Sequence, residues 1–153
     1  MKHNLKRSSV PLAVRTTLLL LFAVAAVTAF PTPSFATGNV VKADLAGNWQ
    51  ITLYGQGGCG VGTSLVTFTL NASGTATNAV EKSHSVGCGD TSSSGNTFTI
   101  QTLNSNGSGT AGLSCGSACG FTFSIQVAPD RSSFNLVDIT DPNNFLIGVA
   151  VHQ

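Results

Sequence analysis

After residue 36, hydrophobic and polar residues alternate with a period of two along most of the chain. In residues 49–53, Trp49, Ile51 and Leu53 alternate with polar residues, and in residues 121–127 Phe, Ile and Val alternate with Thr, Ser and Gln. This alternation is typical of β-strands with one buried and one solvated face, and the residues are of the β-branched and aromatic types that strands favour. The pattern therefore predicts an all-β protein.

Eight such runs predict eight strands. They cover residues 49–54, 66–70, 74–80, 97–101, 109–113, 121–127, 134–136 and 145–151. Several of the connections are rich in Asn, Asp, Gly and Pro, which form tight turns, and short connections place sequential strands side by side and antiparallel. An eight-stranded meander can hide its apolar face by closing into an up-and-down β-barrel, which is the fold that we expect, or by folding into a β-sandwich, which is the alternative.

In a meander, alternate connections meet at the same end of the barrel. The predicted loops 55–63, 81–96, 114–120 and 140–144 share one end, and the tight turns 71–74, 104–108 and 128–132 share the other. The first end holds all four cysteines, and we expect it to be open. The second end is expected to form a closed floor, where Trp49 meets Arg131 in a cation–π contact.

The first 36 residues have a different composition. They carry four basic residues and no acidic one, followed by an apolar run at 17–30, TLLLLFAVAAVTAF, and by the small residues Ser34 and Ala36. This order is typical of a secretory signal peptide cleaved after Ala36, and the apolar run is shorter than the roughly 20 residues of a membrane-spanning helix. We expect a signal peptide at 1–36, a tail at 37–45 and a barrel domain at 46–153, secreted or periplasmic, without membrane contact after cleavage.

Charge is scarce and changes sign along the chain. The whole chain has a net charge of +1, but residues 37–153 contain three basic residues against six acidic ones, a net charge of −3. Only 8% of the residues are charged, so the clusters of Lys and Arg that neutralise phosphates are missing. Nucleic acid is therefore not an expected partner.

The four cysteines predict two disulfides, as is usual for an even number in an exported chain. Cys115 and Cys119 flank a three-residue connection, where the two Cα atoms of a hairpin lie at a distance that suits a disulfide. That leaves Cys59 to pair with Cys88 at the same end of the barrel. A structural zinc site favours closely spaced cysteine pairs that this chain lacks, so we expect no metal and no cofactor.

Residues Ala46-Gly47-Asn48-Trp49 open the first predicted strand behind a short tail. This Gly-x-Trp opening resembles that of the calycin superfamily, which includes lipocalins, avidins and bacterial lipocalin-like protease inhibitors. The resemblance implies a closed barrel with Trp49 packed across its floor. The chain differs from lipocalins by ending on a strand and by carrying Arg131 in a turn, and from avidins by having one Trp. Its last residues, GVAVHQ at 148–153, are similar to the last strand of small exported bacterial barrels.

Few residues are candidates for catalysis. The segment GQGGCG at 55–60 matches G-x-G-x-x-G, but a strand and not a helix is predicted to follow, which excludes a dinucleotide site. His84 lies near Glu81 and Asp90, a combination capable of acid–base chemistry, and we interpret it as a solvated loop histidine. His152 is the penultimate residue. We therefore expect that the protein is not an enzyme.

The main hypothesis is a binding module that holds a small apolar molecule at the open end of the barrel. Phe123, Ile125 and Leu136 are expected to line its cavity, and Asp138, on the inward phase of its strand, to contact the ligand or to be hydrogen-bonded at the rim. The alternative is an interaction protein, such as a lipocalin-like inhibitor that binds a secreted protease through the tail at 37–44 or a disulfide-tied loop, or a structural protein of the cell envelope. A filled interior would favour the alternative; the rings predicted to lie there are Trp49, Phe68, Phe98, Phe121, Phe123, Phe134 and Phe145.

Overall fold

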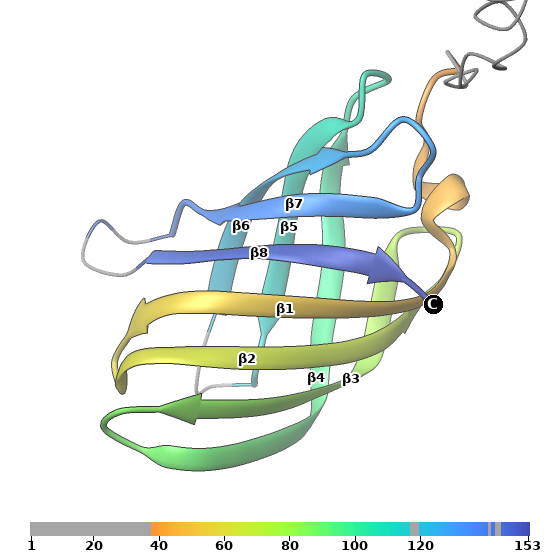
Figure 1. The fold of residues 1–153 in the computed structure, drawn as a ribbon. Coiled ribbons are helices and arrows are strands. Elements are labelled where there is room, and N and C mark those ends of the chain that lie inside the picture. The colour runs from red at the N-terminus through yellow and green to blue at the C-terminus, as the bar shows by residue number, and fades with distance from the viewer. Residues whose placement is uncertain (1–37, 117–119, 141, 143–144) are drawn as a thin grey trace, which may run out of the picture. The chain divides into compact units, whose positions relative to one another are not determined.

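The computed structural model describes residues 38–153 except 117–119, 141 and 143–144, so the predicted signal peptide lies outside the described residues. Eight antiparallel strands follow one another around a closed barrel, in which β8 pairs with β1 (Figure 1). The up-and-down barrel predicted from the sequence is confirmed. The strands are β1 (Gly47–Gly57), β2 (Gly60–Leu70), β3 (Thr75–Ser85), β4 (Gly89–Leu103), β5 (Ser108–Ser114), β6 (Gly120–Val127), β7 (Ser133–Asp138) and β8 (Phe145–His152).

A short 3₁₀-helix, η1 (Lys42–Leu45), precedes β1. It covers the floor of the barrel, where the side chain of Leu45 is fully buried. Nowhere in the described part of the chain is there a helix long and apolar enough to cross a membrane.

At the open end the first four strands are longer than the sequence pattern predicts. β1 and β2 continue to a two-residue turn at Gly58 and Cys59, and β3 and β4 remain paired up to Ser85 and Gly89. The predicted loops 55–63 and 81–96 are therefore mostly paired backbone. Their Gly, Ser and Thr residues gave no apolar alternation because the inward positions at this end face the open mouth, where no apolar partner is required.

One β-bulge changes the phase of β3, and a second bulge lies close to it in the paired strand β4. The pairing of β3 with β4 shifts between Ala76 and Ala79 and again between Ala79 and Glu81. As a result Ala76 and Ala79 are both buried, whereas Val80, which the pattern placed with the apolar positions, is 37% exposed on the outer wall. A bulge inserts one extra residue into a strand and moves the following side chains to the opposite face. Beyond the bulges, Glu81 and Ser83 occupy the half-buried positions of the strand.

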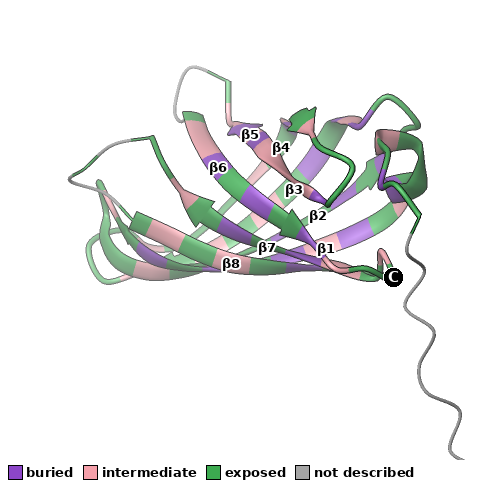
Figure 2. Cartoon of the chain, turned by 90° about the horizontal axis from the view of Figure 1, so that it is seen from above, coloured by how far each residue is buried: buried purple, intermediate pink, exposed green. Residues whose placement is uncertain are grey.

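The inward and outward positions of β8 are the reverse of those expected from the prediction for Phe145. That residue was predicted to lie inside, but it points outward, as do Ile147, Val149 and Val151, and these four are 44–50% exposed. The inward positions hold the smaller set Leu146, Gly148 and Ala150. Figure 2 shows the alternation of exposed and less exposed positions along β8.

The reason for this reversal lies in the neighbouring strands. Gly148 pairs with Leu53 of β1 and Leu136 of β7, both of which are buried. A Cβ atom at Gly148 would lie 2.7 Å from the Leu53 Cδ2 atom and would collide with the carbonyl of Thr52. Large residues on both neighbours therefore exclude a large inward residue at this position of β8.

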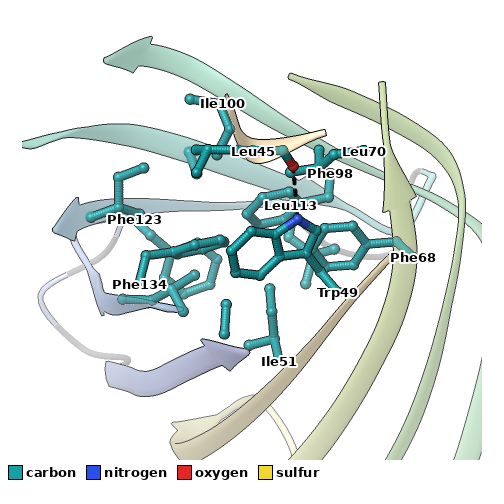
Figure 3. Close-up of a cluster of buried hydrophobic side chains, with 14 of the residues drawn as sticks. Leu45, Trp49, Ile51, Phe68, Leu70, Phe98, Ile100, Leu113, Phe123 and Phe134 are labelled. Atoms are coloured by element: carbon teal, nitrogen blue, oxygen red, sulfur yellow. Dashed lines mark hydrogen bonds between the residues drawn. The ribbon is translucent and has the colours of Figure 1, made fainter. Parts of the chain in front are cut away.

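Aromatic rings fill the half of the barrel nearest the floor. The ring centroids of Trp49 and Phe134 are 4.9 Å apart, those of Phe68 and Phe98 are 4.6 Å apart, and those of Phe98 and Phe134 are 6.1 Å apart (Figure 3). Pairs at such distances are more favourable than the burial of their area alone. The indole nitrogen of Trp49 donates a hydrogen bond of 2.8 Å to the carbonyl of Leu45, so η1 and the ring cluster hold each other in place.

The three turns at the floor share one geometry. In each, the N–H of the fourth residue donates to the carbonyl of the first at 2.9 Å, and the fourth residue has a positive φ. Glycine adopts this conformation readily, whereas a residue with a Cβ atom is strained by it. The fourth residues are Gly74 (φ 79°), Gly107 (φ 83°) and Arg131 (φ 61°).

Arg131 occupies this strained position because its side chain anchors the tail. Its Nε atom donates to Asp44 Oδ2 at 3.0 Å, and Nη2 lies 3.5 Å from the carbonyl oxygens of Gly38 and Asn39. Arg131 is thus at the floor, as the sequence predicts, but its partner there is Asp44. The Trp49 indole, the expected cation–π partner, packs against Phe134 and His152.

The disulfide predicted between Cys59 and Cys88 is present and joins the tips of the β1–β2 and β3–β4 hairpins. Next to it, the N–H of Gly87 donates to the carbonyl of Cys59 at 2.8 Å, so the two tips are also joined through their backbones. Cys115 is disulfide-bonded as well, and Cys119, its predicted partner, lies outside the described residues. A disulfide is consistent with an oxidising compartment.

The double substitution Cys59→Ser, Cys88→Ser is expected to lower the free energy of unfolding by about 3–4 kcal/mol, because the bond closes a loop with a sequence separation of 29 in the unfolded chain. Denaturant titration of both proteins under non-reducing conditions measures this difference. Unreduced peptide maps of the wild-type protein serve as the control, and a cross-linked peptide joining Cys59 to Cys115 or Cys119 would contradict the pairing.

The anchor of the tail is tested by Arg131→Ala and Arg131→Gly. Both lose the contact with Asp44 and both should melt at a lower temperature than the wild type. The glycine variant should be the more stable of the two by about 1 kcal/mol, because glycine removes the strain of the positive φ. Equal stability of the two variants would show that position 131 is not strained.

Acid should also weaken this anchor. The pKa of Asp44 is lowered from 3.8, first by the hydrogen bond from the Val41 N–H and then by that from Arg131. A carboxylate with a lowered folded-state pKa contributes stability that is complete above the unfolded pKa and is lost as the pH falls through the folded value. The melting temperature of Asp44→Asn should therefore fall less than that of the wild type below about pH 4. Some dependence should remain, because the pKa of Asp130 is lowered by hydrogen bonds from Ser132.

Candidate functional site

The open end of the barrel contains a hollow of about 470 Å³, which we call the mouth hollow. Its base is formed by Leu53, Leu113, Phe121 and Leu146, from four different strands. Its sides carry hydroxyl groups, the carboxylate of Glu81 and the Cys59–Cys88 disulfide. Sites for small molecules have volumes of roughly 300–1,000 Å³ and combine an apolar lining with a few polar groups, so the mouth hollow has the size and lining of such a site.

The hollow exists because the inward positions near the mouth carry small residues. On β1, the residues that continue the inward phase of Trp49, Ile51 and Leu53 are Gly55 and Gly57. On β2, Gly62 and Ser64 continue the phase of the buried Val and Phe side chains deeper in the barrel. Glycine and serine leave the space that leucine or phenylalanine fills further down.

Two of these glycines also permit close contact between strands. A Cβ atom at Gly62 would lie 2.9 Å from the Cβ atom of Ser85, and one at Gly55 would collide with the carbonyl of Phe145. The G-x-G-x-x-G segment is therefore part of the wall of the hollow, and strand β2 follows it, as expected for a chance match.

Glu81 is the one acidic side chain among the described residues that line the hollow. Its Oε2 atom accepts a hydrogen bond of 3.5 Å from the hydroxyl of Ser93, which in turn accepts one of 2.8 Å from the amide of Asn96. Asn96 is only 3% exposed, and this network satisfies its amide group. The lining contains neither Lys nor Arg, and its one histidine, His84, is paired with Asp90.

His84 and Asp90 face each other across the β3–β4 hairpin, with 2.7 Å between Nδ1 and Oδ1. Their side chains are 69% and 91% exposed, in agreement with the interpretation of His84 as a solvated histidine. Exposed pairs of this kind contribute little stability. In the described segments, no three His, Cys, Asp or Glu side chains are grouped as metal ligands would be.

The three aromatic and aliphatic residues predicted to line a cavity lie deeper than the mouth hollow. Phe123, Ile125 and Leu136 are at most 3% exposed and belong to the packed core. The hollow itself opens where a cavity was expected, beside residues 55–62 and 81–91, but Leu53 and Phe121 form its base instead.

Asp138 lies at the end of β7 on the inward phase, outside the lining of the mouth hollow. Its Oδ1 atom accepts a hydrogen bond of 2.8 Å from the N–H of Thr140. Its Oδ2 atom is buried and has no hydrogen-bond partner among the described residues. Such an unpaired acceptor costs free energy unless a donor from water or a ligand reaches it, so the predicted ligand contact of Asp138 stays a prediction.

Sequence reasoning did not identify Glu81, Ser83 and Ser64 as residues of the site. The signal was present, since small residues recur at every second position, as in Gly55 and Gly57, and thereby continue the strand phase into the predicted loop. No protein-family model matches the chain, and no curated protein is significantly similar to it.

The network behind Glu81 is tested by Ser93→Ala. This variant leaves the buried amide of Asn96 without its hydrogen-bond partner, which should lower the free energy of unfolding by about 1–2 kcal/mol. Ser94→Ala is the matched control, because Ser94 is exposed and should change stability by less than about 0.5 kcal/mol. Denaturant titration compares the two, and equal effects would contradict a structural role of the network.

Proposed function

We propose that this protein is a binding module that holds a small ligand in the mouth hollow. The observation that carries the proposal is the composition of the hollow: an apolar base, one carboxylate with neither Lys nor Arg in the lining, and walls whose inward residues are the small glycine and serine. The core below is packed, with Phe123 fully buried, so the ligand occupies the mouth and not the depth of the barrel.

The chemistry of the lining favours an amphipathic cation, such as an amine with an alkyl or aromatic body. The body would pack against Leu53, Phe121 and Leu146, and the ammonium group would pair with the Glu81 carboxylate. The walls are preorganised, because the Cys59–Cys88 disulfide ties their hairpins together and paired backbone extends to both tips. Preorganised walls reduce the entropy lost on binding.

We further propose that the protein is exported, that residues 1–36 are its signal peptide, and that it acts in the periplasm or outside the cell. The basic start, the apolar run and the small residues before position 37 support this, together with the disulfide. Kinship with the calycins is a proposal too, supported by the strand order and by Trp49 at the floor. No catalytic role is proposed.

The test uses two fluorescent probes with the same dansyl group and alkyl chain, one ending in an amine and the other in a carboxylate. We expect the amine probe to bind about tenfold more tightly, a difference of about 1.4 kcal/mol, and Glu81→Gln to remove that preference. Fluorescence titration measures both affinities, and an unchanged preference in Glu81→Gln would contradict the role of Glu81.

The site itself is tested by filling it. Ser64→Leu places a larger side chain on an inward position of the hollow and should abolish binding of both probes, whereas Thr67→Leu on the outer face of the same strand should bind as the wild type does. If the Ser64→Leu variant bound both probes as the wild type does, the mouth hollow would not be the ligand site. Native mass spectrometry of protein purified from its own host would identify a retained ligand.

A second candidate function, interaction with another protein, is favoured by the filled core of the barrel and by the exposed apolar residues of β8. The tail at 38–45 is a weak candidate for the contacting segment. Its Val40 N–H donates to the carbonyl of Ser105, and Asp44 is held by Arg131, so the tail is bound to the floor and not free to enter a partner. The outer wall of the barrel at β8 is therefore the better candidate for contact with another protein.

A further inference from the structure

The outer wall of the barrel carries an apolar face centred on β8. Its residues are 44–52% exposed and contiguous, because Ile147 pairs with Tyr54 of β1 on one side and with Val137 of β7 on the other. We call this set the β8 face; it comprises Tyr54, Val137, Phe145, Ile147, Val149 and Val151.

Barrel closure does not require these side chains to be apolar. The outward positions of β2 are mixed: Thr63, Thr67 and Thr69 are exposed hydroxyl residues of good strand propensity, and they stand beside the apolar Val61 and Leu65. On β8, by contrast, the exposed positions from Phe145 to Val151 are all apolar. The largest apolar patch of a monomeric protein covers about 300–600 Å² and is often functional, so this face is a candidate interaction site.

The electrostatics of the face suit a second copy of the same chain. None of its six residues is charged, and its polar neighbours in the pairing register, Gln50, Thr52 and Asn135, are neutral. Residues 37–153 carry a net charge of −3, so two copies would repel each other through most surfaces but would bring no like charges together here.

The exposed area of the β8 face also suits a dimer interface with a second copy of this chain. Six half-exposed side chains present roughly 500 Å² of surface, taking about 200 Å² for a whole aromatic side chain and less for an aliphatic one. Two copies therefore bury about 1,000 Å² through these side chains alone, and the neutral rim brings the total towards the roughly 1,200–2,000 Å² of specific interfaces.

The backbone allows only one way of packing. A closed barrel has no free strand edge, so a partner cannot extend the sheet and must stack on it face to face. A shallow hollow of about 510 Å³ lies between Ile147, Val149 and Tyr54, which gives the face a concave centre.

We propose that the β8 face is the interface of a two-fold symmetric dimer of this chain, with the β8 strands stacked across the axis. In a two-fold dimer the same patch serves both subunits, which suits a neutral and uniformly apolar face. The mouth hollow lies at the end of the barrel, and its ligand site is separate from this proposal.

The experiment is sedimentation velocity over a wide range of protein concentrations, on protein expressed from the full coding chain with its N-terminus determined by mass spectrometry. The wild type should be a dimer. Ile147→Glu should weaken the dimer by roughly a thousandfold, because a central interface residue is typically worth about thirtyfold and symmetry counts each substitution twice. Val80→Glu, which places the same charge on the outer wall at β3, should remain dimeric.

Circular dichroism and Trp fluorescence establish that the variants are folded, and Val149→Thr with Val151→Thr is a milder second variant that keeps β-branched residues on β8. A wild type that is monomeric up to about millimolar concentration overturns the proposal. So does dimerisation that neither set of β8 substitutions weakens, or a monomer whose β8 face instead binds phospholipid vesicles.

Discussion

The volume inside an eight-stranded barrel is the constraint on which the rest of this structure depends. Such a barrel is just wide enough for its own side chains, so each large inward residue must face small ones. Trp49 and Phe134 fill the floor, and β8, which lies between their strands, contributes Ala150 and Gly148 to the interior. Where the large residues end, glycine and serine leave the mouth hollow.

The same constraint determines which residues of β8 lie on the outer wall. Once Leu53 and Leu136 occupy the space beside Gly148, the larger residues of β8 are placed on the outward phase of the strand. Interior packing determines which phase turns outward, but it does not determine that the outward residues are apolar. Threonine would fit those positions equally well, so the choice of Phe145, Ile147, Val149 and Val151 requires a reason outside the barrel.

The strand order, the closed barrel and the Cys59–Cys88 disulfide could be predicted from the sequence, because alternation, short turns and the parity of connections depend on local residue types. The bulges of β3 and β4 could not, because an extra residue has no compositional signal, and the bulge of β3 turns Val80 outward. The inward face of β8 could not be predicted from its own residues, because its more apolar face is the outer one. Only the pairing register shows that Leu53 of β1 leaves no space for a large inward residue on β8.

Strand β1 contributes residues to both the mouth hollow and the β8 face. Successive residues of a strand point to opposite faces, so Leu53 of β1 contributes to the base of the hollow while Tyr54 contributes to the outer face. Leu53 also borders the shallow hollow of the outer face, so a substitution there would disturb both surfaces and could not separate them. Of the two surfaces, Ser64 and Glu81 line only the mouth hollow, and Ile147 lies only on the β8 face. The two surfaces can therefore be tested separately, because the barrel keeps their side chains on opposite sides of one sheet.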